Sequence, residues 1–164
     1  MSPWSVAEQA WAEQVVQQDL PPSLHPGWLP VLGRVEMFQS LSKGHLRKVA
    51  RLTEPKRFEK GAVVVNAGSR GDALYVILDG EARLTTPDGH TKTLAAGDSF
   101  GELALLDGAP RAATVVATDS LATAMISRIA FQKLLKQEPQ VAVGLTRGLV
   151  AIVRELQPTA PQSV

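Results

Sequence analysis

The sequence predicts a mainly β domain with helices at both ends. Of its 13 glycines, eight fall between positions 61 and 108, and most of these are seven to nine residues apart. Turn signals at this spacing, with short apolar runs between them, are typical of a sandwich, roll or barrel of short strands. Helix-capping residues lie on either side of this block. A composition with 45% hydrophobic and 20% charged residues excludes a disordered chain.

The segment before the glycine-rich block predicts helices. Ser5 and Glu8 have the spacing of a capping box in an N-terminal arm whose apolar residues recur at helical spacing. Four prolines between positions 21 and 30 then form a stiff connector that cannot be helix interior. Ser42 can cap a further helix that runs to about Leu52. The apolar positions of the arm are Trp4, Ala7, Trp11 and Val15.

Six strand-like runs follow the first helices. Pro87, Asp88 and Gly89 form a good hairpin turn between the third and fourth runs. Each run is short and bounded by turn residues, as in an all-β domain. The runs are Ala62–Val65, Ala73–Leu78, Ala82–Thr86, Thr91–Ala95, Thr114–Ala117 and Leu121–Ile126.

Two helices are predicted after the strands. Ser127 can cap the first of them, and Pro139 marks the break before a last helix that runs to about Leu156. This last helix has two apolar sides, so it contacts more than one surface. Either it packs between the roll and the arm, or part of it serves a ligand, a partner or a second copy. One side carries Val141, Leu145, Leu149, Ile152 and Leu156; the other carries Val143, Val150 and Ala151.

Charge and composition exclude several function classes. The net charge is +1, so no strong overall field attracts nucleic acid or an anionic membrane. The absence of cysteine excludes disulfides, thiolate metal sites and thiol nucleophiles. No apolar run approaches about 20 residues, and the N-terminus lacks the pattern of a secretory signal. We therefore expect a cytoplasmic protein without membrane insertion. Residues 43–60 carry a local charge of +5, which indicates either a solvated face or a docking site for an acidic partner.

The segment from Gly97 to Val115 carries the chemistry. Gly101 permits a tight turn with close backbone approach, and a short helix is expected from Glu102 to about Leu106. Free N–H groups at a helix start favour an anion, and Arg111 supplies a planar, permanently charged guanidinium. Glu102 would repel an anion there, but its carboxylate can accept from a sugar hydroxyl. Each residue alone has an ordinary structural explanation; together they indicate a ribose phosphate.

The ordered run also carries a family resemblance. Phe100-Gly101-Glu102-Leu103-Ala104-Leu105-Leu106, followed by Gly108-Ala109-Pro110-Arg111-Ala112-Ala113-Thr114-Val115, resembles the phosphate-binding cassette of cyclic nucleotide-binding domains. That family includes regulatory subunits of cAMP-dependent kinase, bacterial catabolite activators and cyclic nucleotide-gated channels. The likeness extends over about residues 35–155. It implies an eight-stranded antiparallel β-roll, jelly-roll-like, with N-terminal helices and two C-terminal helices.

The resemblance also implies a role for each matching residue. Glu102 would accept from the ribose 2′-hydroxyl, Arg111 would pair with the cyclic phosphate, and backbone N–H groups would complete the cradle. Ala112 stands where threonine tends to accompany cGMP, so the resemblance favours cAMP and leaves cGMP possible. Arg147 resembles an arginine of bacterial channel domains that reaches the base. The ligand-binding residues implied are Phe100, Gly101, Glu102, Leu103, Ala104, Arg111, Ala112, Ala113 and Arg147.

These observations predict a stand-alone, cAMP-preferring receptor in which ligand closes the last helix and changes contacts with an unidentified effector protein. We expect a helical arm and Pro-rich connector over residues 1–30, the binding domain over 31–157 and a flexible tail over 158–164. The remaining tail is too short for a DNA-binding module, so direct DNA binding is not expected. A homodimer through the helices, and a scaffold protein that ignores nucleotide, stay open as alternatives. A metal-dependent enzyme needs several histidines that converge on a metal, and the three histidines of this sequence are dispersed. We therefore expect no metal site and no enzyme activity.

Overall fold

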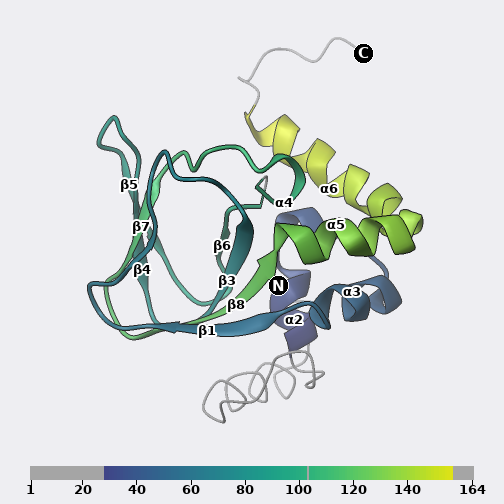
Figure 1. The fold of residues 1–164 in the computed structure, drawn as a ribbon, viewed down its shortest axis with the longest axis horizontal. Helices are drawn as coiled ribbons and strands as arrows, with labels where there is room; N and C mark the ends of the chain where they lie inside the picture. Colours follow the sequence, from purple (N-terminus) through teal and green to yellow (C-terminus); the bar gives the residue numbers. More distant parts are fainter. Residues whose placement is uncertain (1–27, 103, 157–164) are drawn as a thin grey trace.

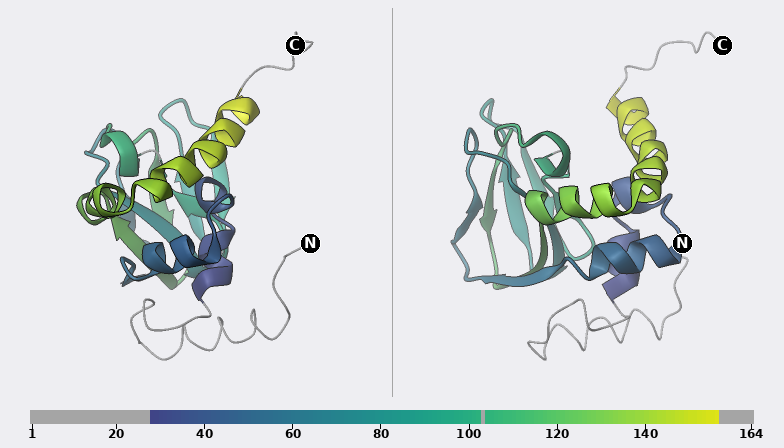
Figure 2. Two further views of the ribbon diagram at one scale, coloured as in Figure 1. Left: turned by 90° about the vertical axis from the view of Figure 1, so that its right-hand side faces the viewer. Right: turned by 45° about the vertical axis from the view of Figure 1, so that its right-hand side comes forward.

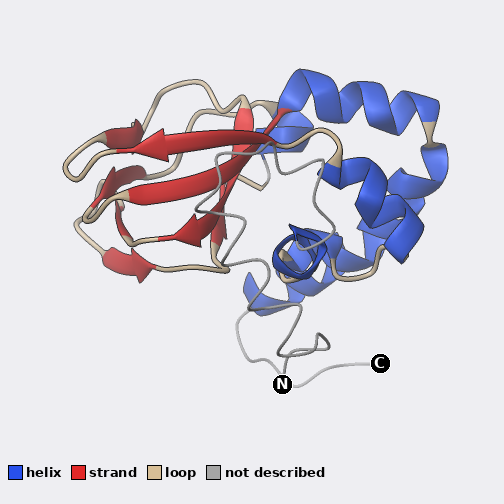
Figure 3. Cartoon of the chain, turned by 90° about the horizontal axis from the view of Figure 1, so that it is seen from below, coloured by secondary structure: helices blue, strands red, loops and turns tan. Residues whose placement is uncertain are grey.

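A computed structural model describes residues 28–102 and 104–156 of the chain. The strands form a roll at one end of the molecule and most helices gather at the other (Figures 1 and 3). Within these residues, eight strands make two antiparallel four-stranded sheets, ordered β1-β8-β3-β6 and β2-β7-β4-β5. The antiparallel β-roll with flanking helices is therefore confirmed.

The first sheet pairs segments that are far apart in the sequence. Its strands are β1 (Glu54–Phe58), β8 (Leu121–Ser127), β3 (Ala73–Asp79) and β6 (Ser99–Phe100). The two central strands, β3 and β8, read as nearly continuous apolar runs because both faces of this part of the sheet are covered. The second sheet contains β2 (Val63–Val65), β7 (Thr114–Ala117), β4 (Ala82–Thr85) and β5 (Thr91–Leu94).

All six predicted strand runs are confirmed within one residue at each end, and two strands were missed. β1 reads Glu-Pro-Lys-Arg-Phe and exposes its first four residues, so it shows none of the alternation that predicts a strand. β6 has only two residues, which is too short for any periodic pattern. Both strands form because β8 and β3 offer them paired edges, a tertiary effect that the local sequence does not carry.

Two of the predicted helix caps are confirmed, and the third, Ser5, lies outside the described residues. Ser42 Oγ accepts from His45 N–H at 3.1 Å, and Ser127 Oγ accepts from Ala130 N–H at 3.2 Å. Each bond satisfies an otherwise free donor at a helix start. The helices are α2 (Trp28–Gly33), α3 (Lys43–Ala50), α4 (Ala104–Asp107), α5 (Arg128–Gln137) and α6 (Pro139–Leu156), with a 3-10 turn η2 (Glu36–Phe38).

The expected proline connector is wrong at its last residue. Pro30 is the third residue of α2, so the connector does not extend to position 30 as a non-helical segment. Proline is tolerated there because the first turn of a helix has no internal partner for the N–H that proline lacks. The helical arm and the other three prolines lie outside the described residues.

Two hydrophobic clusters hold the fold together. One fills the roll between the sheets, around Ile77, Leu94 and Val115. The other joins the helices to the first sheet, and in it the rings of Phe38 and Phe131 lie 6.1 Å apart. α4 contributes the fully buried Leu105 to this second cluster. The cassette is thereby anchored in the same core that supports the helices.

α6 lies at the helical end of the molecule and packs on η2 and α5 (Figure 2). Val141 and Leu145, from the first of the two apolar sides, are buried. Gly148 lies so close to η2 that an added Cβ would stand 2.5 Å from the Met37 carbonyl oxygen. The opposite side remains uncovered among the described residues, with Val143 71% and Val153 54% exposed. None of the described helices is long and apolar enough to cross a bilayer.

Candidate functional site

The cassette runs from the end of β6 to the start of β7 and is held by the loop before β3. Within that loop, Ser69 O accepts from Arg111 N–H at 2.7 Å, and Gly68 N–H donates to Arg111 O at 2.8 Å. A third backbone bond joins Gly71 N–H to Ala109 O at 3.1 Å. The backbone of Arg111 is therefore bonded on both its N–H and its C=O, which fixes where its side chain starts.

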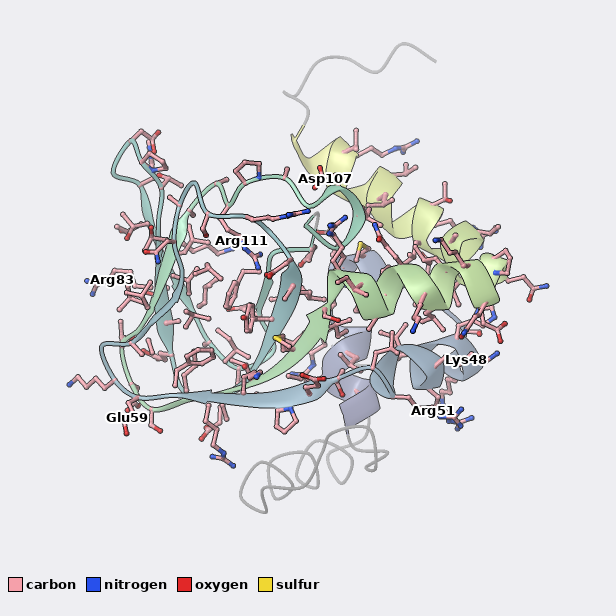
Figure 4. All side chains as sticks on the ribbon, in the orientation of Figure 1. Lys48, Arg51, Glu59, Arg83, Asp107 and Arg111 are labelled. Atoms are coloured by element: carbon pink, nitrogen blue, oxygen red, sulfur yellow. The ribbon has the colours of Figure 1, made fainter. Side chains whose placement is uncertain are left out.

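The Arg111 guanidinium is buried with one nitrogen unpaired. The side chain, labelled in Figure 4, is only 6% exposed, and its Nη2 donates to the Ala73 carbonyl oxygen at 2.7 Å. Its Nη1 is buried and has no hydrogen-bond partner among the described residues. The nearest carboxylate oxygen, Asp72 Oδ1, is 3.9 Å from Nη2. A buried charge with a free donor is unfavourable unless a partner arrives, and an anionic ligand would be such a partner.

Burial also affects the ionisation of two groups here. It lowers the pKa of the Arg111 guanidinium, an effect that neighbouring Tyr75 and Asp72 oppose. Arginine still keeps its charge at any physiological pH. Burial raises the pKa of Tyr75, so this residue remains a neutral phenol. The site therefore presents a permanent positive charge with reduced hydration.

Gly101 makes room for this guanidinium. Its φ of +85° is a conformation that side chains rarely adopt. An added Cβ would lie 2.2 Å from Arg111 Nη1 and 2.7 Å from Ala73 O. Both the turn and the space therefore require glycine, as the sequence predicts.

Glu102 follows directly and places a carboxylate beside the arginine. It is half-buried, and Ser99 Oγ donates a hydrogen bond to its Oε1. The expectation that a helix starts at Glu102 is wrong, because α4 begins at Ala104. Glu102 lies in the preceding turn, where its carbonyl accepts from Leu105 N–H at 3.2 Å. No ion pair joins Glu102 to Arg111 among the described residues, so the acceptor and the cation stay available separately.

The other predicted site residues have different environments. Phe100 is buried and its ring stacks on Tyr75, with centroids 5.2 Å apart, so its contact is with the core of the roll. Ala112 is exposed and Ala113 half-buried, just before β7. Ala104 is the first residue of α4, and Leu103 lies outside the described residues. Arg147 is exposed on α6, and no hydrogen bond or ion pair links it to the described part of the cassette.

Sequence reasoning missed the partners of the two central residues. Asp72, Ala73 and Tyr75 surround Arg111 but come from β3 and the loop before it. Their contribution rests on strand pairing and a backbone carbonyl, which no local motif reveals. Ser99 could have been found, because a serine three residues before a glutamate in a turn is within hydrogen-bond reach.

Comparison with known proteins identifies the family. A family model described as "Cyclic nucleotide-binding domain" matches residues 55–138, just over half of the chain. A cyclic nucleotide-gated potassium channel of Rhizobium etli is 35% identical over 112 residues, which cover 68% of this chain and 31% of the channel. A cAMP-dependent protein kinase regulatory subunit of Colletotrichum orbiculare is 39% identical over 106 residues, 63% of this chain and 27% of that protein. The chain thus spans less than a third of the length of these curated relatives.

Solved structures agree with this assignment. The N-terminal domain of a transcriptional regulator from Streptomyces coelicolor A3(2) superposes with a TM-score of 0.69 at 27% identity, covering 81% of this chain and 99% of that one. The catabolite activator protein of Thermus thermophilus gives a TM-score of 0.60 at 28% identity, covering 73% and 59%. With the matching family model and the cassette geometry, these likenesses show that the chain belongs to the cyclic nucleotide-binding domain family.

Proposed function

We propose that this chain is a receptor for a cyclic nucleotide, in which Arg111 pairs with the cyclic phosphate and Glu102 accepts from the ribose 2′-hydroxyl. The observation that carries the proposal is the buried Arg111 guanidinium with its unpaired Nη1. A phosphate oxygen would supply the missing acceptor and offset the burial of the charge. Glu102, one residue from Gly101, then meets the hydroxyl of the same ligand. Backbone N–H groups near Leu103, Ala104, Ala112 and Ala113 would complete the phosphate cradle.

The ligand that we favour is cAMP, with cGMP as a weaker competitor. Ala112 has no side-chain hydroxyl that could hydrogen-bond to the amino group of guanine. The similarity to a subunit named for cAMP-dependent kinase supports the same choice. We assign Arg147, which is exposed on α6, to the base.

The receptor would signal through α6. Its uncovered side carries Val143, Val150 and Val153, which are apolar residues that water solvates poorly. Closure of α6 over the nucleotide would change how much of this surface is available to an effector protein or to a second copy of the chain.

Two other functions are weaker. A scaffold that ignores nucleotide gives no reason to keep Arg111 buried with a free donor. A metal-dependent enzyme on a similar roll needs converging ligands, and the described residues contain no group of three or more His, Asp or Glu that could hold a metal ion. We therefore propose binding rather than catalysis.

Calorimetric titration of nucleotide-stripped protein with cAMP and cGMP tests the proposal. Arg111→Ala should weaken cAMP binding by about thirtyfold or more, because truncating one partner of a buried charge pair costs about 2–5 kcal/mol. Arg111→Lys keeps the charge but loses the planar fork, and should also weaken binding. Arg83→Ala is the matched control, since Arg83 is exposed on β4 away from the cassette (Figure 4).

Wild-type protein that gives saturable cAMP binding, lost in Arg111→Ala and kept in Arg83→Ala, supports the receptor. Absence of binding by the wild type, or equal binding by folded Arg111→Ala, would rule it out. Circular dichroism of each variant shows that the fold is intact before the titration is interpreted.

A further inference from the structure

Ser99 has a contact that the recognition of phosphate and base does not use. It is the first residue of β6, it is half-buried, and its Oγ donates a hydrogen bond to Glu102 Oε1. Among the described residues, the Glu102 carboxylate makes no other hydrogen bond. The second oxygen, Oε2, has no partner there.

The position of Ser99 is fixed by the strand that carries it. Ser99 pairs with Val76 on β3, and the next residue, Phe100, pairs with Tyr75. Just before it, Asp98 N–H donates to Ala95 O at 2.9 Å, and the Asp98 carboxylate accepts from Ala95 N–H at 2.9 Å. The hydroxyl therefore projects from a short strand whose backbone is held by β3 and by the turn before it.

Gly101 brings Glu102 back to this hydroxyl. Its positive φ turns the chain immediately after β6, so that Glu102 lies within hydrogen-bond reach of the residue three positions earlier. A glutamate side chain has several rotamers, and ordering them opposes binding. With Oε1 held by Ser99, the carboxylate is ordered before ligand arrives, and Oε2 is left to accept from a ligand hydroxyl.

We propose that Ser99 is a positioning residue for Glu102 and sets the preference of the site for a ribose over a 2′-deoxyribose cyclic nucleotide. This inference rests on the proposed function, because it assumes that Glu102 meets the 2′-hydroxyl. It adds that the discrimination depends on a residue that does not itself touch the nucleotide.

Titrations with cAMP and with 2′-deoxy-cAMP test the inference. Wild-type protein should bind cAMP about tenfold or more tightly than the deoxy ligand, as expected for a hydrogen bond to a charged group. Ser99→Ala should weaken cAMP binding by about threefold to tenfold and change deoxy binding by less than about twofold. Ser99→Thr keeps a hydroxyl and should restore the wild-type ratio. Ser120→Ala, the same change at an exposed turn before β8, should leave both affinities unchanged.

A double variant shows whether Ser99 acts through Glu102. In a Glu102→Ala background, Ser99→Ala should have no further effect on cAMP affinity, since the carboxylate that it positions is gone. Equal weakening of both ligands by Ser99→Ala, or an unchanged ratio, overturns the inference and leaves the receptor intact. Wild-type protein that binds neither ligand overturns the receptor and the inference together.

Discussion

At Gly101, backbone conformation and available space impose the same requirement. Gly101→Ala should abolish cyclic nucleotide binding, because its Cβ would displace the Arg111 guanidinium from the Ala73 carbonyl that holds it. Because alanine is strained at a positive φ, the substitution should also lower the free energy of unfolding by about 1–2 kcal/mol. Calorimetric titration with cAMP and chemical denaturation measure the two effects.

Gly89→Ala separates the clash from the backbone strain. Gly89 has a φ of +92°, close to that of Gly101, but an added Cβ there would meet no atom within 4 Å. This variant should lose a similar amount of stability and keep its affinity for cAMP. Equal loss of affinity in both variants would mean that strain, and not the space beside Arg111, explains the result.

Individual site residues were predictable to different degrees. Glu102 and Arg111 could be identified from the sequence because they stand nine positions apart in an ordered run that, taken as a whole, resembles a known phosphate-binding cassette. The unpaired Nη1 of Arg111 could not be identified from the sequence, since the placement of the guanidinium depends on the hydrogen bond from Nη2 to the Ala73 carbonyl oxygen. Contacts of this kind exist only after β3 and the cassette have been brought together.

At the scale of elements, local signals located helix starts well and short strands poorly. Ser42 and Ser127 act through a neighbour three residues away, so the sequence contains the whole interaction. β1 has no such local signal: its partner β8 lies more than 60 residues further along the chain. Glu102 lies in a turn and not in the expected helix, and its carboxylate accepts a hydrogen bond from Ser99 Oγ there.

A surface ion pair joins α3 to the α5–α6 junction. Lys48 Nζ donates to Glu138 Oε1, and Glu138 is the residue at which α5 ends, with φ −130° and ψ 75°. The hydrogen bond from Lys48, followed by its charge, lowers the pKa of Glu138 below its ordinary value of 4.5. A carboxyl whose pKa is lower in the folded protein than in the unfolded chain stabilises the fold when the pH is above its pKa in the unfolded chain. This contribution disappears as the pH falls through its pKa in the folded protein.

Glu138→Gln should therefore reduce thermal stability slightly at neutral pH, and the difference from wild type should shrink on acidification below about pH 4.5. Both groups are partly solvated, so the effect is that of a surface pair. Thermal unfolding followed by circular dichroism between pH 3 and 7 provides the measurement. Glu81→Gln on the exposed β3–β4 turn serves as control. A wild-type advantage that persists unchanged at the lowest pH would contradict the role given to this pair.

At the scale of the whole molecule, one hydrophobic cluster joins the cassette to the C-terminal helices. α4 places Leu105 in the same hydrophobic cluster as Phe131 of α5 and Val141 of α6. A change in the cassette can therefore reach α6 through packed side chains. The two apolar sides of α6 were predictable from its sequence, but which side is buried depends on η2, whose Met37 leaves room only for Gly148.

Hydrogen–deuterium exchange of the whole chain, with and without cAMP, tests the central claim most directly. Cassette amides between residues 101 and 113 should exchange more slowly with cAMP, because nucleotide on Arg111 and Glu102 orders that segment. If α6 closes, residues 139–156 should slow as well, and Arg111→Ala should abolish both effects. Unchanged exchange in the cassette at saturating cAMP, or protection confined to another part of the chain, would contradict a cyclic nucleotide site built on Arg111 and Glu102.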